Sequence, residues 1–102
     1  MVAAAPNLTR LEGTITSREP HPTLGGWDRV RVAVSTVAPV PGQADLLTPR
    51  ARQGEVDLAV RSALLGAAGA GWHIAVRAKL TQTGVVAEGY PREGDFRVSP
   101  PG

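Results

Sequence analysis

Hydrophobic and polar residues alternate along most of this chain. The alternation is clearest in four stretches, at residues 10–16, 29–35, 56–61 and 72–80. Successive side chains of a β-strand point to opposite faces, so each stretch is predicted to bury one face and expose the other. Valine is the commonest inward-facing residue, and β-branched residues favour the pleated surface of a sheet. The pattern therefore predicts an all-β protein.

Turn-forming residues separate the predicted strands. Two prolines and two glycines within 20–26 predict a flexible connection after the first strand. The Pro-Val-Pro-Gly sequence at 39–42 is predicted to end the second strand, because proline cannot donate to a central ladder, and a longer loop is expected at 43–54. Residues 82–84 suit a hairpin, and a turn at 91–94 either divides the last strand or ends a small hairpin. The chain is thus expected to contain five strands, or six if the last is divided.

One segment departs from the alternation. Residues 62–68 are predicted to form about two helical turns, with Ser62 as the N-cap and Gly69 or Gly71 as the stop. Five strands with a short helix between the third and fourth are typical of an OB-fold Greek-key barrel, whose closure hides the strand edges. A β-sandwich is the alternative, although it usually has about seven strands. We predict a single OB-like domain over residues 1–102, with tails at 1–6 and 99–102.

The composition narrows the possible chemistry. The 102 residues suit one domain, and the absence of cysteine excludes disulfides, a thiol nucleophile and an iron–sulfur cluster. The two histidines, His21 and His73, are too isolated to predict a metal site, and no serine stands in a Gly-x-Ser-x-Gly context. The glycine-rich segment 66–71 lacks the Lys-Ser/Thr end of a phosphate-binding loop. We therefore expect no enzymatic activity, no metal and no cofactor.

Charge and hydropathy bear on location and partners. Eleven basic residues face nine acidic ones, and ten of the eleven are arginine, so the placement of the arginines matters more than their number. The longest apolar run, at 63–72, is about half the ~20 residues that span a bilayer. The first residues carry no basic region, and Pro6 ends their apolar run. We expect a cytoplasmic protein without a membrane partner.

Three segments resemble strands of the bacterial single-stranded DNA-binding proteins. At 7–15, Asn-Leu-Thr-Arg-Leu-Glu-Gly-Thr-Ile is similar to that family's first strand, in which an Asn precedes an apolar residue and an x-Gly-x-apolar unit; a proline, here Pro20, follows. Residues 25–36 look like its Gly-led second strand. Residues 71–80 look like its fourth strand, with Ala78 where the family usually has Gly.

The resemblance spans residues 7–98 and implies an OB fold that binds single-stranded DNA. It also implies a homo-oligomer and replication or repair proteins as partners. The family usually carries aromatic stacking residues in its third strand and helix, whereas residues 56–71 contain none. This departure indicates a divergent or accessory member.

Candidate nucleic-acid contacts follow from the alternation and the turns. Single-strand binding needs cations that track the phosphates and aromatic faces on which bases stack. The cations predicted on outward faces or at strand ends are Arg10, Arg18, Arg29, Arg31, Arg61, Arg77, Lys79 and Arg97, and all of these except Arg61 are candidate nucleic-acid contacts. If the strands pair in the usual barrel order, Arg10 and Arg18 are expected near Arg29 and Arg31.

The chain contains four aromatic residues, and two of them are candidates for stacking on bases. Trp27, at a strand start, and Tyr90, before a proline, are the predicted stacking residues. Trp72 and Phe96 share the register of the inward-facing residues and are predicted to lie in the core.

Two functions fit this pattern. The first is binding of single-stranded nucleic acid, with DNA favoured and RNA as the alternative, through cation–phosphate contacts and limited stacking. The second is a protein–protein interaction or assembly module, in which the same barrel presents an apolar edge to a partner; the few aromatic residues and the nearly neutral charge favour it. The outward arginines have a simpler explanation as well, a solvated exterior on which they pair with Glu12, Asp28 and Asp57.

Overall fold

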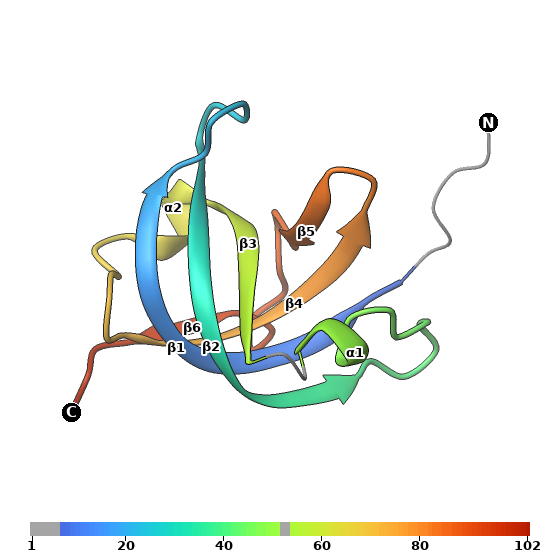
Figure 1. Cartoon of the computed structure of the whole chain (residues 1–102). Coiled ribbons are helices and arrows are strands. Elements are labelled where there is room, and N and C mark those ends of the chain that lie inside the picture. Colours follow the sequence, from blue (N-terminus) through green and yellow to red (C-terminus); the bar gives the residue numbers. More distant parts are fainter. Residues whose placement is uncertain (1–6, 52–53) are drawn as a thin grey trace.

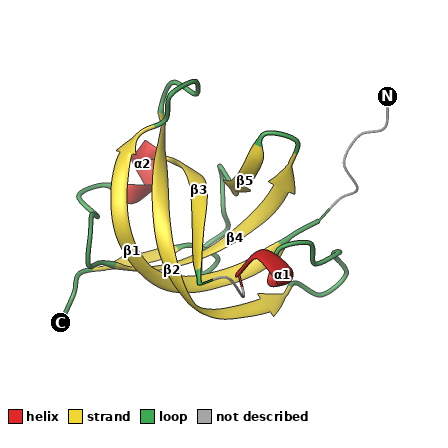
Figure 2. Ribbon diagram, viewed as in Figure 1, coloured by secondary structure: helices red, strands yellow, loops and turns green. Residues whose placement is uncertain are grey.

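The computed structural model describes residues 7–51 and 54–102, so the predicted tail at 1–6 lies outside the described residues. The strands are β1 (Thr9–Pro20), β2 (Trp27–Pro39), β3 (Glu55–Arg61), β4 (His73–Thr81), β5 (Gly84–Ala87) and β6 (Arg97–Ser99). The two short helices are α1 (Thr48–Ala51) and α2 (Ser62–Leu65). Figures 1 and 2 show the strands curving around a common centre, with α2 beside one end of the barrel.

The strand order closes the sheet into a barrel. The order is β1-β2-β3-β5-β4, and β4 pairs back to β1. β3 and β5 are parallel, whereas the other neighbours are antiparallel. This closed five-stranded barrel, with α2 between β3 and β4, confirms the predicted all-β OB-fold class. β6 pairs with β4, so the last strand is divided, and Ser99, predicted to start the tail, belongs to β6.

The β1–β2 pairing contains a bulge beside Gly13, where β2 carries one extra residue, Ser35. β1 pairs with β2 along its length and with β4 over Thr9 to Thr14, and its register with β2 shifts between Glu12 and Gly13. A Cβ built on Gly13 would overlap the carbonyl oxygen of Ala33 and lie 2.9 Å from its carbonyl carbon. The close approach of two backbones thus requires glycine here.

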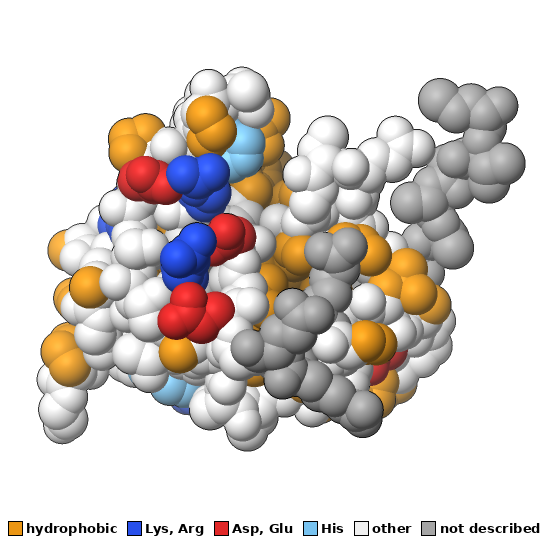
Figure 3. Space-filling view, viewed as in Figure 1, with side chains coloured by type: hydrophobic (Ala, Val, Ile, Leu, Met, Phe, Trp, Pro, Cys, Tyr) orange, Lys and Arg blue, Asp and Glu red, His pale blue; other side chains and the backbone are white. Residues whose placement is uncertain are grey.

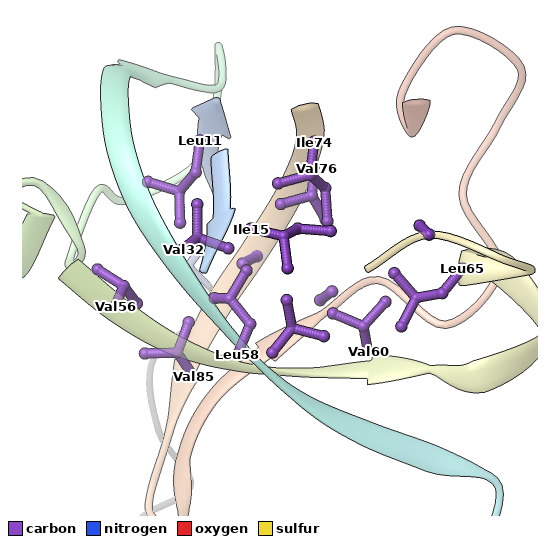
Figure 4. Packing of buried hydrophobic residues seen from close by; sticks show 14 of the residues in the cluster. Leu11, Ile15, Val32, Val56, Leu58, Val60, Leu65, Ile74, Val76 and Val85 are labelled. Atoms are coloured by element: carbon purple, nitrogen blue, oxygen red, sulfur yellow. The ribbon is translucent and has the colours of Figure 1, made fainter. Parts of the chain in front are cut away.

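The inward faces of the strands form one core. Figure 4 shows side chains from β1, β2, β3, β4 and β5 pointing toward one another, with Leu65 of α2 beside them. The alternation predicted these inward faces, and valine and isoleucine occupy most of them. Trp72 and Phe96 are partly buried and pack against this core, as predicted.

Two local predictions are corrected. The predicted helix over 62–68 contains only Ser62–Leu65, and Arg61 rather than Ser62 is its N-cap. The hydroxyl of Ser62 instead donates to the carboxylate of Asp28, and the helix ends at Gly66, whose φ of 54° favours glycine. Neither four-residue helix is long enough to cross a membrane, and the described residues contain no other helix.

The predicted loop after β2 contains the unpredicted helix α1. The Asp45 carboxylate starts it by accepting hydrogen bonds from the backbone N–H groups of Leu47 and Thr48, at 3.2 and 3.1 Å. It also accepts from the hydroxyls of Thr48 and of the buried Thr9, which ties the loop to β1. A single short polar side chain therefore shapes this loop.

Asp45 should make the stability depend on pH in acid. The hydrogen bond from the Thr48 hydroxyl, helped by that from Thr9, outweighs the burial and holds the pKa of Asp45 below its ordinary value of 3.8. A lowered folded-state pKa stabilises the fold fully above the unfolded-state value, and this stability disappears as the pH falls through the folded-state pKa. We expect the melting temperature of Asp45→Asn to fall less than that of the native chain between about pH 5 and pH 2. Thermal melts in which both proteins lose the same number of degrees between these pH values would contradict this prediction.

Candidate nucleic-acid interface

A groove lies on the outer face of the barrel between two loops. It has a volume of about 460 Å³, and we call it the loop groove. Its lining comes from the β1–β2 loop, β2, β3, the β4–β5 loop and β5: His21, Pro22, Thr23, Leu24, Arg29, Asp57, Leu58, Ala59, Thr83 and Val86. OB barrels bind oligonucleotides and oligosaccharides on the face of strands 2 and 3, between these same loops. The groove thus occupies the usual ligand position of the fold.

A second hollow adjoins the first at Val86. This aromatic pocket has a volume of about 590 Å³ and is lined by Leu8, Trp27, Lys79, Val86, Ala87, Glu88, Gly89 and Tyr90. Val86 lines both hollows, because it is the outward-facing residue between the inward-facing Val85 and Ala87. Three of the sequence-predicted site residues, Trp27, Lys79 and Tyr90, therefore meet in one pocket although they come from three different segments.

Arg61 does not line the aromatic pocket but lies next to two residues that do, Trp27 and Tyr90. Trp27 opposes Arg61 in the β2–β3 register, and the ring of Trp27 lies 3.5 Å from a Cβ built on Gly89. The guanidinium of Arg61 lies 4.2 Å from the ring centroid of Tyr90, which is a cation–π contact. The Arg61 Nε is buried and has no hydrogen-bond partner within the part of the chain that the structure describes.

The sequence places Arg61 at an outward strand end but does not include it among the candidate contacts. Its contact with Tyr90 joins the end of β3 to the segment after β5. The sequence signal that could have found it is the outward position of residue 61 in the alternation of 56–61. Only the β2–β3 register shows that this position faces Trp27.

The outward arginines of β2 belong to a charge ladder with acidic neighbours. We define the charge ladder as Glu19, Arg29, Arg31, Glu55 and Asp57, which lie on β1, β2 and β3. Arg29 forms an ion pair with Glu19, and Arg31 lies 2.9 Å from Asp57 and 3.7 Å from Glu55. Figure 3 shows basic and acidic side chains alternating over this face, with hydrophobic side chains beside them.

The ion pair between Arg31 and Asp57 shifts the pKa of both side chains. The hydrogen bond from Arg31 lowers the pKa of Asp57 despite its partial burial, and the same bond raises the pKa of Arg31. Both side chains are about half exposed, at 52% and 49%, so solvent weakens the pair. At neutral pH the ladder holds two guanidinium groups against three carboxylates, and it is therefore not a positive surface.

Arg77 holds the segment that follows β5. Its Nε and Nη2 donate to the two carboxylate oxygens of Glu88 at 2.6 and 2.7 Å, and Asp95 lies 3.6 Å away. Its side chain is only 23% exposed. The hydrogen bond that Arg77 donates to Glu88, helped by the charge of Asp95, raises the pKa of Arg77. Arg77 thus positions the edge of the aromatic pocket through Glu88.

Arg18 holds one end of the barrel together. It donates to Asp28 at 2.5 Å and to the carbonyl oxygens of Gly66 and Ala68 at 2.8 and 2.7 Å. Burial favours the neutral form of Asp28, but the hydrogen bonds from Arg18 and Ser62 outweigh it and lower the pKa of this carboxyl. Arg18 opposes Val30 in the β1–β2 register, yet its guanidinium reaches Asp28 and the loop carbonyls after α2 rather than the loop groove.

The remaining two predicted cations lie elsewhere. Arg10 opposes Ala38 on β2 and Arg77 on β4, and lies 3.8 Å from Glu12. The expectation that Arg10 lies near Arg29 and Arg31 is therefore wrong, because the register places it near the far end of β2. Arg97 is exposed on β6, and neither Arg10 nor Arg97 lines the loop groove or the aromatic pocket.

The predicted arginines do not form one unpaired positive track. Five of them have carboxylate partners: Arg10, Arg18, Arg29, Arg31 and Arg77. Over residues 7–51 and 54–102, by contrast, Lys79 and Arg61 have no carboxylate within ion-pair distance. Lys79 lines the aromatic pocket and Arg61 lies against its Tyr90, so two described cations without a carboxylate partner are close to this pocket.

The described residues contain no group of three or more His, Cys, Asp or Glu side chains that could hold a metal ion. No protein-family model matches the sequence, and neither the curated proteins nor the solved structures give a match. The resemblance to bacterial single-stranded DNA-binding proteins therefore stays a prediction.

Proposed function

We propose that the chain binds single-stranded nucleic acid, with DNA favoured over RNA by the resemblance alone, on the outer face of its OB barrel. The observation that carries the proposal is the meeting of Trp27, Lys79 and Tyr90 in the aromatic pocket. Two aromatic rings and a free cation are the elements that single-strand binding combines. The loop groove, at the usual ligand position of the fold, adjoins this pocket.

The mechanism relies more on stacking than on phosphate tracking. Tyr90 is 84% exposed, so a base can stack on the ring without first displacing protein atoms. Lys79, and Arg61 behind Tyr90, supply the positive charge for a phosphate. Arg29, Arg31 and Arg77 are engaged by carboxylates and contribute little net charge. The proposal thus replaces an arginine track with a compact stacking site.

Two variants that change the charge equally test the site. Lys79→Gln and Arg97→Gln each remove one positive charge from an exposed strand position, but only Lys79 lines the aromatic pocket. A phosphate contact on single-stranded nucleic acid contributes about 0.7 to the salt slope, or about fivefold in affinity near 0.1 M salt. We expect Lys79→Gln to weaken binding of a labelled oligothymidylate about fivefold in fluorescence anisotropy, and Arg97→Gln to leave it unchanged.

Two results would count against this site. Equal losses in both variants would show that only the overall charge matters. No binding by the native chain at low salt would exclude the function itself.

A protein-binding module is the second candidate function. The charge ladder favours it, because a nearly neutral surface of paired charges does not attract a polyanion. Leu24, a loop-groove residue that is 41% exposed, would contact such a partner. A protein that is captured in the presence of excess oligonucleotide, and lost with Leu24→Ser, would support this function over the first.

The oligomeric state, location and partners that we propose are those predicted from the sequence. One or two stacking residues give modest affinity, so a second copy of the chain would strengthen binding by multiplying the sites. We place the protein in the cytoplasm, with replication or repair proteins as further partners. Light scattering on the purified chain, with and without oligonucleotide, measures the oligomeric state.

A further inference from the structure

The two halves of the outer face carry opposite net charge. Around the aromatic pocket there are three cations, Arg61, Arg77 and Lys79, against the carboxylates of Glu88 and Asp95. In the charge ladder there are two guanidinium groups against three carboxylates. The net charge thus changes from positive to negative across the face, on either side of Val86.

Asp57 stands where a bound strand would leave the aromatic pocket. It lines the loop groove together with Val86, which both hollows share. A strand that extends from the pocket along the groove therefore brings its next phosphate toward this carboxylate. The distance over which charges act is about 8–10 Å at physiological salt, so Asp57 affects phosphates in the groove more than those in the pocket.

A phosphate that displaced Asp57 from Arg31 would gain little. Exposed ion pairs are worth only about 0–1 kcal/mol, so the pair itself can open. The displaced carboxylate, however, stays on β3 beside Glu55, and both would then repel the phosphate. Arg31 is thus available to a phosphate only if a carboxylate is removed.

We propose that the charge ladder closes the loop groove to the phosphates of a bound strand, so that Asp57 limits the nucleic-acid footprint to the aromatic pocket. This inference rests on the proposed function. It assigns Asp57 a role in specificity: short strands and strand ends bind as well as long strands, although the groove itself has room for more nucleotides.

Asp57→Asn tests the inference with little change in shape. The matched control is Glu93→Gln, which changes the charge equally at an exposed residue that lines neither hollow. Oligothymidylates of about 4 and about 12 nucleotides cover the low and high ends of OB-fold site sizes. Anisotropy titrations across a salt series, with thermal melts of each variant, give the affinity, the salt slope and the stability.

We expect Asp57→Asn to bind the longer strand about fivefold more tightly, with a salt slope steeper by about 0.7. Its affinity for the shorter strand should equal that of the native chain. Arg31→Gln should leave native binding unchanged but abolish the gain of Asp57→Asn, because Arg31 supplies the released charge. Glu93→Gln should bind both strands as the native chain does.

The outcomes separate this inference from the function on which it rests. If the native chain binds and Asp57→Asn gains nothing, or gains no more than Glu93→Gln, the footprint inference is wrong and the proposed function stands. A loss of native affinity with Arg31→Gln also overturns the inference, because Arg31 would already hold a phosphate. If neither the native chain nor Asp57→Asn binds either strand, both proposals fail.

Discussion

Gly13→Ala is expected to lower the stability of the barrel by about 3 kcal/mol, the upper end of the range for overpacking. The added methyl group would overlap the Ala33 carbonyl oxygen and lie 2.8 Å from the Cγ1 of the buried Val32. The β2 backbone cannot retreat without breaking its pairing with β1 at the bulge, where Gly13 is aligned with Val34. For a domain of this size we expect the melting temperature to fall by about 10–20 °C in circular dichroism.

Gly25→Ala and Gly69→Ala are the matched controls for this prediction. Neither glycine has a positive φ, and a Cβ built on either meets no atom within 4 Å. The same substitution there should be neutral or slightly stabilising, because alanine restricts the unfolded chain. A Gly13→Ala variant with the same melting temperature as these controls would contradict the requirement for glycine where β1 closely approaches β2.

Tyr90→Ala is expected to weaken oligonucleotide binding by about 5-fold to 150-fold, which corresponds to the ~1–3 kcal/mol that a stacked base contributes. The substitution removes a ring that is 84% exposed, and with it the surface on which Arg61 lies. The melting temperature should stay nearly the same, because the exposed ring buries little area. Quenching of tryptophan fluorescence by the oligonucleotide measures the affinity, since Trp27 lines the same pocket.

Tyr90→Phe and Trp27→Ala complete this test. Tyr90→Phe keeps the stacking face and should bind nearly as the native chain does. Trp27→Ala should also weaken binding, but the indole ring packs beside Gly89, so some loss of stability is expected with it. Native affinity in Tyr90→Ala would remove stacking on Tyr90 from the mechanism. Loss of affinity with Tyr90→Phe as well would point to the hydroxyl group instead.

The pattern of the sequence predicted the strand faces well, because alternation is a local property. Val30, Val32 and Ile74 are each at most 1% exposed, and the alternation assigned all of them to the inward side. The two turns rich in proline and glycine after β1 and β2 also fall where they were predicted. The helix α1 could not be predicted in the same way, since it depends on the Asp45 carboxylate and its bond to Thr9, a residue far away in the sequence.

The candidate site was predicted only in part, because it too depends on contacts between residues that are far apart in the sequence. Trp27, Lys79 and Tyr90 were recognised as outward or loop residues, but their meeting in one pocket depends on how β2, β4 and the segment after β5 are arranged. The partners of the arginines could not be read from sequence distance. Arg31 and Asp57 are 26 residues apart, and they pair because the β2–β3 register aligns them.

The amino-acid sequence alone determined which residues face inward, where the chain turns and that the fold is an all-β barrel, because a period of two and the geometry of proline and glycine act over a few neighbouring residues. Tertiary structure decided which charges are free. The residue that the neighbouring strand aligns beside an outward guanidinium decides whether that charge is neutralised. Asp57 neutralises Arg31, whereas Trp27, aligned with Arg61, carries no charge. Strand register is a property of the closed barrel, and it is the register that separates the charge ladder from the aromatic pocket.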